Sequence, residues 1–258
     1  KLRENGCKIH IKNDKIILRS DERLKSVNLV ETMPFPGFPT DMQSQYVALC
    51  CTAKGSTLVV ENLFETRYRY AAELKRMGAD ITVRDRSALI RGVEKLHGCE
   101  HTVIPDRIEA GTFMVAGAMY SDGITINRVC REHMKSISDL LVECGHVVEY
   151  NEDGTSVFVK PGEKPRSGKI LTNPYPESPT DMQAQMTALF AVTPGISVVK
   201  DTIFPQRFMH CSELKRMGAN IKVDNGTAII TGVEGLSGAP VMASDLRASA
   251  ALVLAALA

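Results

Sequence analysis

Two aspartates in the same place of a repeated motif are the first candidates for chemistry. Asp181 lies in Pro179–Gln185, and Asp41 lies in the matching Pro39–Gln45, 140 residues earlier. A carboxylate can act as a general base when it reaches a substrate hydroxyl. Each aspartate also follows a threonine that is expected to cap a helix, where a negative charge is stabilised by about 0.3–1 kcal/mol. Position alone therefore leaves catalysis and helix capping open for both.

Arginines are the second group of candidates, because a guanidinium can bind a carboxylate or phosphate through two parallel hydrogen bonds. Arg247 lies at the start of an expected helix, where its charge opposes the helix dipole, so an anionic partner is indicated. Arg207 also opens an expected helix, and a solvated side chain is its alternative. Arg107 corresponds to Arg247 by the 140-residue period. For Arg107 we favour a contact with Glu109 between repeats or domains over catalysis.

The elements that must position these side chains are themselves repeated. Glu73–Ala79 returns as Glu213–Ala219, and Gly92–Glu94 returns as Gly232–Glu234, with the same spacing as the aspartate motif. A fixed period of this kind is typical of repeated structural units.

The second copy shows the order of elements most clearly. Thr180 is expected to cap a helix, with Gln183 completing a capping box. A β-branched strand follows, then a second helix that ends at Gly218, then a hairpin that turns at Asn225-Gly226. We therefore predict an α/β (α+β) fold of repeated βαβαββ units, packed around shared helices with the sheets outside.

The expected boundaries follow the repeat. Residues 1–32 are interpreted as the tail of a preceding unit, 33–101 and 173–240 as the two Pro-Thr-Asp-Met-Gln units, 102–172 as a middle unit of the same order, and 241–258 as the truncated start of a further unit, capped by Ser244. Because the chain does not begin with Met and stops inside a helical pattern, we expect it to be a piece of a longer protein.

Composition limits the partners. The net charge of +1 gives no reason to expect nucleic acid or an anionic membrane. The longest apolar run, Ala250–Ala258, is too short to span a bilayer, which takes roughly 20 residues. Seven cysteines without paired spacing indicate free thiols in a reducing cytosol, so a cytoplasmic location is expected.

Several longer motifs resemble the UDP-N-acetylglucosamine 1-carboxyvinyltransferase (enolpyruvyl transferase) family. They cover residues 92–258 in family order and are Ile104–Phe113, Pro179–Gln185, Arg207–His210, Glu213–Ala219, Gly232–Gly238 and Ser244–Ala250. The resemblance implies inside-out, barrel-like α/β domains of three βαβαββ units each. It also implies transfer of an enolpyruvyl group from phosphoenolpyruvate to the 3-hydroxyl of UDP-N-acetylglucosamine, the first committed step of peptidoglycan synthesis, without a metal or cofactor.

The resemblance also implies roles for individual residues. Asp181 matches the carboxylate that binds the sugar nucleotide and serves as the base, and Asp245 matches a second acidic group near the reacting carbon. Arg207 and Arg247 match arginines that face the phosphoenolpyruvate anions. Thr180 and Ile203 match positions at the sugar nucleotide, and the possible equivalents belonging to the first copy are Asp41, Leu63, Arg67 and Arg107.

Two departures from the family pattern matter. The family's Lys-Asn segment and its Gly-Cys-x-Ile-Gly-x-Arg-Pro loop do not occur in this sequence, so we expect that the catalytic domain carrying them is missing and that the chain alone is inactive. A Pro-Thr-Asp-Met-Gln unit also stands where the family has a different unit. We interpret this as a joining of two related sequences near Gly92–Gly98, by recombination, duplication or sequence assembly.

Two alternatives stay open. The chain could be a non-catalytic sugar-nucleotide-binding or structural repeat protein. It could also be a sibling enzyme, such as the shikimate-pathway enolpyruvyl transferase or the RNA 3′-phosphate cyclase, although the Pro-Thr-Asp-Met-Gln and Asp-Leu-Arg-Ala-Ser motifs favour the sugar-nucleotide branch.

Overall fold

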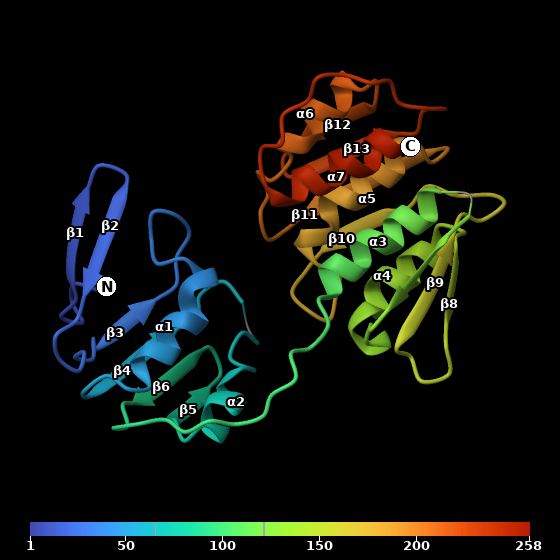
Figure 1. The fold of residues 1–258 in the computed structure, drawn as a ribbon. Coiled ribbons are helices and arrows are strands. Elements are labelled where there is room, and N and C mark those ends of the chain that lie inside the picture. The colour runs from blue at the N-terminus through green and yellow to red at the C-terminus, as the bar shows by residue number, and fades with distance from the viewer. Residues whose placement is uncertain (65, 121) are drawn as a thin grey trace. The chain divides into compact units, whose positions relative to one another are not determined.

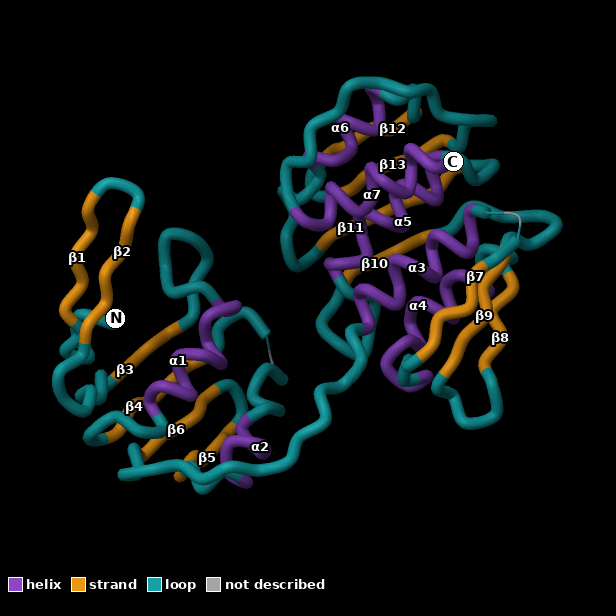
Figure 2. Tube along the Cα trace, viewed as in Figure 1, coloured by secondary structure: helices purple, strands orange, loops and turns teal. Residues whose placement is uncertain are grey.

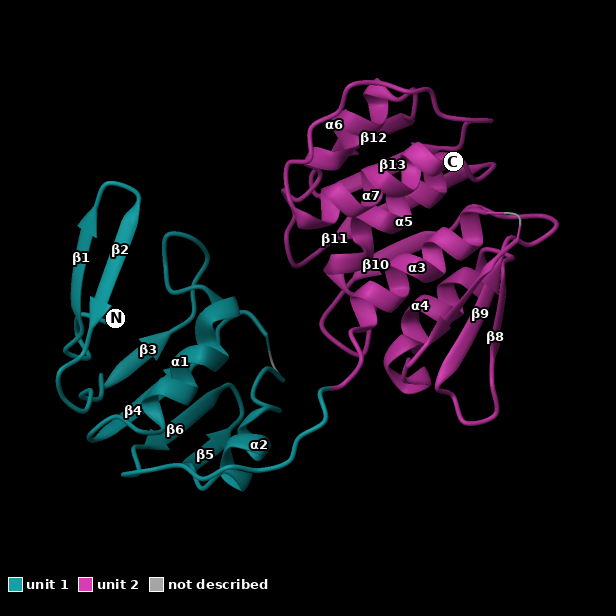
Figure 3. Cartoon of the chain, viewed as in Figure 1, with its two compact units in different colours: residues 1–103 teal, residues 104–258 magenta. Residues whose placement is uncertain are grey.

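The chain forms two compact units, residues 1–103 (unit 1) and 104–258 (unit 2), coloured separately in Figure 3. The computed structural model describes residues 1–64, 66–120 and 122–258. Unit 1 thus joins the expected segments 1–32 and 33–101, and unit 2 joins the remaining three. Among the described residues, no helix has the length and apolar composition needed to cross a bilayer.

Unit 1 consists of a separate hairpin and a four-stranded sheet with two short helices. Its elements, labelled in Figure 1, are β1 (Lys8–Lys12), β2 (Lys15–Arg19), β3 (Leu29–Glu31), a 3-10 helix (Thr40–Met42), α1 (Gln43–Cys50), β4 (Ser56–Val60), α2 (Ala71–Arg76), β5 (Asp80–Arg84) and β6 (Ser87–Arg91). The sheet order is β3-β4-β6-β5, with β3 parallel to β4 and the other neighbours antiparallel.

Unit 2 has a three-stranded and a four-stranded sheet, shown in orange in Figure 2. Its elements are α3 (Arg107–Met119), β7 (Ile124–Asn127), α4 (Arg131–Glu143), β8 (Val147–Tyr150), β9 (Ser156–Lys160), β10 (Lys169–Thr172), a 3-10 helix (Thr180–Met182), α5 (Gln183–Ala191), β11 (Ile196–Asp201), α6 (Met209–Arg216), β12 (Asn220–Asp224), β13 (Thr227–Thr231) and α7 (Leu246–Leu257). The strand orders are β7-β9-β8 and β10-β11-β13-β12.

The repeat predicted from the sequence is present in the strand register. Leu29 pairs with Leu58 in the first copy, and Lys169 pairs with Val198 in the second, so the parallel pairs are offset by the same 140 residues. Each copy then adds an antiparallel hairpin to the parallel pair. The βαβαββ order of the two copies and the mixed α/β fold are therefore confirmed. The middle unit was expected to have the same order, but its described residues begin with α3 and form a sheet of three strands without a leading strand. The second hairpin turns at Asn225 and Gly226, both with positive φ (45° and 71°), as a two-residue turn requires.

Helices α3, α5 and α7 pack side by side in unit 2 (Figure 1). All nine residues of α5 are buried, because the sheet and the helices around it cover it. In the first copy, α1 buries only Gln43, Tyr46, Val47 and Cys50 of its eight residues. The second copy therefore lies at the centre of its unit.

Two helix starts differ from the prediction. Thr180 does not cap α5, and no capping box forms with Gln183, because the Thr180 hydroxyl donates to the carboxylate of Asp201 at 2.6 Å instead. Helix α7 is capped by Asp245 and not by Ser244, since the Asp245 carboxylate accepts from the backbone N–H groups of the next turn. Only at α7 does a carboxylate replace the expected hydroxyl as the acceptor, since the start of α5 has no side-chain cap.

Candidate functional site

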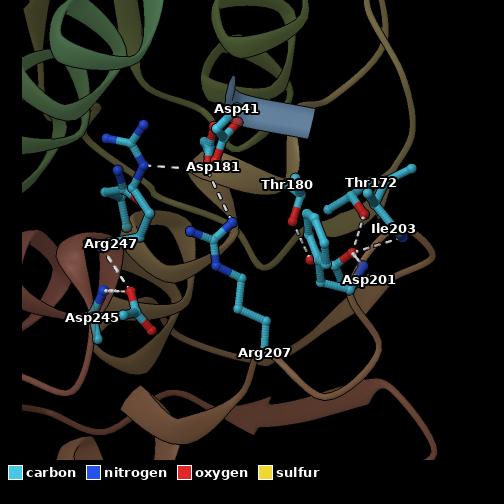
Figure 4. Close-up of polar contacts among 12 residues, drawn as sticks. Asp41, Thr172, Thr180, Asp181, Asp201, Ile203, Arg207, Asp245 and Arg247 are labelled. Atoms are coloured by element: carbon cyan, nitrogen blue, oxygen red, sulfur yellow. Dashed lines mark hydrogen bonds and ion pairs between the residues drawn. The ribbon is translucent and has the colours of Figure 1, made fainter. Parts of the chain in front are cut away.

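One carboxylate in unit 2 binds two arginines from separate elements. Oδ1 of Asp181 lies 2.9 Å from Nη1 of Arg207 and 3.2 Å from Nε of Arg247. Asp181 comes from the 3-10 helix before α5, Arg207 from the loop before α6, and Arg247 from the first turn of α7. Figure 4 shows both arginine side chains pointing at the aspartate. We call these three residues the Asp181 site.

The charges of the Asp181 site keep its carboxylate ionised. Burial alone would raise the pKa of Asp181, but the hydrogen bonds and charges of Arg247 and Arg207 outweigh burial and hold the pKa below its ordinary value. The Asp181 side chain is still 38% exposed, so a ligand can reach it. An ionised carboxylate can accept a proton, but its basicity is weak while both arginines bind it.

A buried carboxylate behind the site fixes its backbone. Asp201, at the end of β11, is 2% exposed and accepts from the hydroxyls of Thr172 (2.8 Å) and Thr180 (2.6 Å). It also accepts from the backbone N–H groups of Ile203 (2.9 Å) and Phe204 (2.8 Å), as Figure 4 shows for Ile203. We call this set the Asp201 junction. It ties the start of the Asp181 helix to the loop that carries Arg207.

The sequence reading missed the Asp201 junction, although the repeat contains a signal for it. Glu61 occupies the corresponding position in the first copy, is fully buried, and accepts from Thr32 and Thr40, both at 2.9 Å. It also accepts from the backbone N–H of Leu63 at 2.9 Å. An acidic residue at the end of a buried strand, repeated together with two threonines, could have been recognised as a structural carboxylate.

The remaining predicted residues of the second copy lie around these two groups. Oδ1 of Asp245 accepts from the backbone N–H groups of Arg247 (2.8 Å) and Ala248 (2.9 Å), so Asp245 fixes the turn that presents Arg247. Arg207 also lies over the ring of Phe204, with Cζ 5.7 Å from the ring centroid. Ile203 is held through its backbone N–H at the Asp201 junction.

His210, the second residue of α6, lies in the interior of unit 2. Its side chain is 1% exposed and stacks on Phe208 with ring centroids 6.1 Å apart. Burial lowers the pKa of His210 to about 4, so the ring is neutral near pH 7. A neutral, enclosed imidazole next to the loop of Arg207 supports the loop by packing.

Comparison with known proteins decides the family. The family model described as EPSP synthase (3-phosphoshikimate 1-carboxyvinyltransferase) matches residues 1–87 and 81–258. The chain belongs to the EPSP synthase family. This assignment agrees with the enolpyruvyl transferase resemblance of the motifs, and it covers both copies of the repeat.

Curated relatives within the EPSP synthase family carry a more specific name. A UDP-N-acetylglucosamine 1-carboxyvinyltransferase from Akkermansia muciniphila is 58% identical over 98% of this chain and 60% of its own length. UDP-N-acetylglucosamine 1-carboxyvinyltransferase 1 from Caldanaerobacter subterraneus subsp. tengcongensis is 47% identical over 85% of this chain and 53% of its own length. The chain thus spans between half and two thirds of these relatives. Because the first match includes both copies, it favours an inherited arrangement over an error of sequence assembly.

Solved structures agree on the fold of the EPSP synthase family. The enolpyruvyl transferase NikO from Streptomyces tendae superposes with a TM-score of 0.69 at 22% identity, covering 99% of this chain and 62% of that chain. An EPSP synthase from Acinetobacter baumannii gives 0.65 at 20% identity, with the same coverage.

The first copy has only part of the arrangement at Asp181. Asp41 pairs with Nη2 of Arg67 at 2.7 Å, and its side chain is 87% exposed. Leu63 is held at Glu61 as Ile203 is held at Asp201. Arg107, which corresponds to Arg247 by the period, belongs to unit 2, where the carboxylates of Asp181 and Asp106 act on its charge.

Proposed function

We propose that this chain supplies one domain's share of an enolpyruvyl transferase site. The reaction transfers the enolpyruvyl group of phosphoenolpyruvate to the 3-hydroxyl of UDP-N-acetylglucosamine and releases phosphate, as the first committed step of peptidoglycan synthesis. The observation that carries the proposal is the meeting of Asp181, Arg207 and Arg247 in one partly exposed cluster. The names of the curated relatives support the substrate.

In this proposal the arginines switch partners when substrate binds. Arg207 and Arg247 take the carboxylate and phosphate oxygens of phosphoenolpyruvate, for which planar, paired donors are suited. Their hold on Asp181 then weakens, and the pKa of Asp181 rises toward its ordinary value. Asp181 thereby becomes a better base for the sugar hydroxyl at the moment when the second substrate is present.

Other residues of unit 2 have supporting roles in the same proposal. Asp181, Thr180 and Ile203 contact the sugar nucleotide, and Asp245 acts as the second acidic group near the reacting carbon. The only Lys-Asn pair among these 258 residues, Lys12-Asn13, lies at the turn of the β1–β2 hairpin, and the cysteine-bearing loop of the family is not among them. We therefore expect the part of the relatives' length that this chain does not span to provide the family's Lys-Asn segment and its loop, and we expect this chain alone to bind substrate without turnover.

Isothermal titration with UDP-N-acetylglucosamine, followed by a phosphate-release assay with phosphoenolpyruvate, tests the proposal. We expect binding, no phosphate release, and binding that is weaker by about tenfold or more in Asp181→Ala, because charge-assisted hydrogen bonds are lost. Unchanged binding in Asp181→Ala would remove Asp181 from the site. Phosphate release by the chain alone would show that the absent loop is not required. No binding at all would favour a structural repeat protein.

A further inference from the structure

Arg107 is a third arginine near Asp181, and the helix geometry is unfavourable for its charge. It is the first residue of α3, where the helix dipole opposes a cation. One oxygen of the preceding Asp106 caps α3 by accepting from the backbone N–H groups of Ile108 and Glu109. The guanidinium of Arg107 lies over the ring of Tyr175, with Cζ 5.1 Å from the ring centroid.

Close packing of α3 against α5 brings Arg107 toward the Asp181 site. A Cβ at Gly111 would lie 2.7 Å from Cδ1 of Ile137 and 2.9 Å from Sδ of Met182, so the absence of a side chain at Gly111 lets these side chains pack closely on α3. One turn along, Gln185 donates to Thr112 at 3.0 Å and joins the two helices. The second turn of α3 therefore lies against the start of α5. Burial lowers the pKa of Arg107, and Asp181 is the strongest of the charges that oppose this effect.

The hydrogen bonds of Arg107 are incomplete. Its Nη1 is buried and has no hydrogen-bond partner among the residues that the structure describes. Oδ1 of Asp181 is already bound to Arg207 and Arg247, and Asp106 is the other carboxylate whose charge acts on Arg107. A half-buried guanidinium with an unused, buried donor is unfavourable unless an acceptor completes it. The unused donor at this place therefore suits a ligand that carries a phosphate or carboxylate group.

We propose that Arg107 is a third anion-binding arginine of the Asp181 site and that it binds a phosphate or carboxylate oxygen of the substrate beside Arg207 and Arg247. This inference rests on the proposed function. It adds Arg107, which the repeat spacing assigns to the first copy, to the site that the second copy forms. The anion can come from phosphoenolpyruvate or from the diphosphate of the sugar nucleotide, and the two sources are separated by titrating each one.

The test uses the 258-residue chain with three variants. Arg107→Gln removes the charge, and Arg107→Lys keeps the charge without the planar donors. Arg131→Gln is the matched control, because Arg131 is also the first residue of a helix and also lies over a tyrosine ring, at 5.2 Å from Tyr150, but it is exposed. Each protein is titrated with phosphoenolpyruvate and with UDP-N-acetylglucosamine, and thermal unfolding is followed with and without each ligand.

We expect Arg107→Gln to weaken binding of one of the two ligands by about tenfold or more, Arg107→Lys to weaken it less, and Arg131→Gln to leave both affinities within about twofold. The ligand that is affected identifies the anion. Arg107→Gln should also keep or raise the melting temperature without ligand, because it removes a desolvated charge.

Two results would overturn the inference. One is binding by Arg107→Gln that equals the wild type, and the other is a loss of stability in both Arg107 variants without ligand, which would give Arg107 a structural role. Failure of the wild type to bind either ligand would instead contradict the proposed function itself.

Discussion

The two copies of the repeat have the same internal support but different surroundings. Each has a buried carboxylate, Glu61 or Asp201, that binds two threonine hydroxyls and the backbone of the following loop. Each also has an aspartate–arginine pair, Asp41–Arg67 or Asp181–Arg207. Among the residues that the structure describes, only the second aspartate binds an arginine from another helix, Arg247 of α7. The repeat therefore supplies the buried carboxylate and one aspartate–arginine pair in each copy. In unit 2 a neighbouring helix adds a second arginine to the aspartate.

The largest expected effect comes from breaking the shared support. Asp201→Ala leaves two hydroxyls and two backbone N–H groups without their acceptor, so the free energy of unfolding should fall by about 3 kcal/mol or more. Hydrogen exchange should increase most in residues 172–204. Glu61→Ala should act on residues 32–64 in the same way. If Asp201→Ala exchanges like the wild type, the Asp201 junction does not hold the loop.

The next effect concerns a position at which the copies differ. Tyr70 of the first copy donates to Gln43 at 2.7 Å. In the second copy His210 replaces this tyrosine, and the buried side chain of Gln183 has no hydrogen-bond partner among the described residues. Because burial lowers the pKa of His210 to about 4, the unfolded chain takes up a proton near pH 6.5 before the folded chain does. Stability is therefore fully present above pH 6.5 and is lost as the pH falls toward 4, by about 2 kcal/mol at pH 5.

His210→Tyr copies the first repeat and should remove this part of the pH dependence. Urea unfolding at pH 7 and pH 5 measures the difference for the variant and the wild type. An equal loss of stability in both proteins would assign the acid sensitivity to other groups, such as the carboxylates of the ion pairs.

The smallest effect is expected at the first copy's ion pair. Asp41 is 87% exposed, so Arg67→Ala should change the free energy of unfolding by less than about 1 kcal/mol. Asp41→Ala should leave UDP-N-acetylglucosamine binding within about twofold of the wild type, in contrast to Asp181→Ala. Equal losses of binding in both aspartate variants would mean that the first copy also takes part in a site.

The sequence was sufficient for the order of elements, because the period repeats both the apolar pattern and the turn residues. Asn225-Gly226, for example, has few conformations available other than a hairpin turn. The residues of the Asp181 site were named individually from the motifs, and the structure brings Asp181, Arg207 and Arg247 together. Their chemical roles remain predictions.

The parts that the sequence did not reveal depend on contacts between distant residues. Thr180 has a hydroxyl that is suitable for capping the following helix. In the folded chain this hydroxyl instead donates to the carboxylate of Asp201, 21 residues later. Arg107 belongs to the first copy by its spacing, whereas the packing of α3 against α5 places it with the second. His210 is a polar residue at the start of α6, and its enclosure becomes visible only in the structure, where its side chain is 1% exposed.

The enclosure of α5 has a consequence for how the two copies can diverge. A helix without a solvent-facing side has no position at which a larger or charged residue is accommodated easily, so nearly every substitution in residues 183–191 should be selected against. Residues 44, 45, 48 and 49 of α1 are not fully buried and can vary more freely. A saturation mutagenesis of both segments should therefore give a nearly uniform intolerance in α5 and a periodic one in α1.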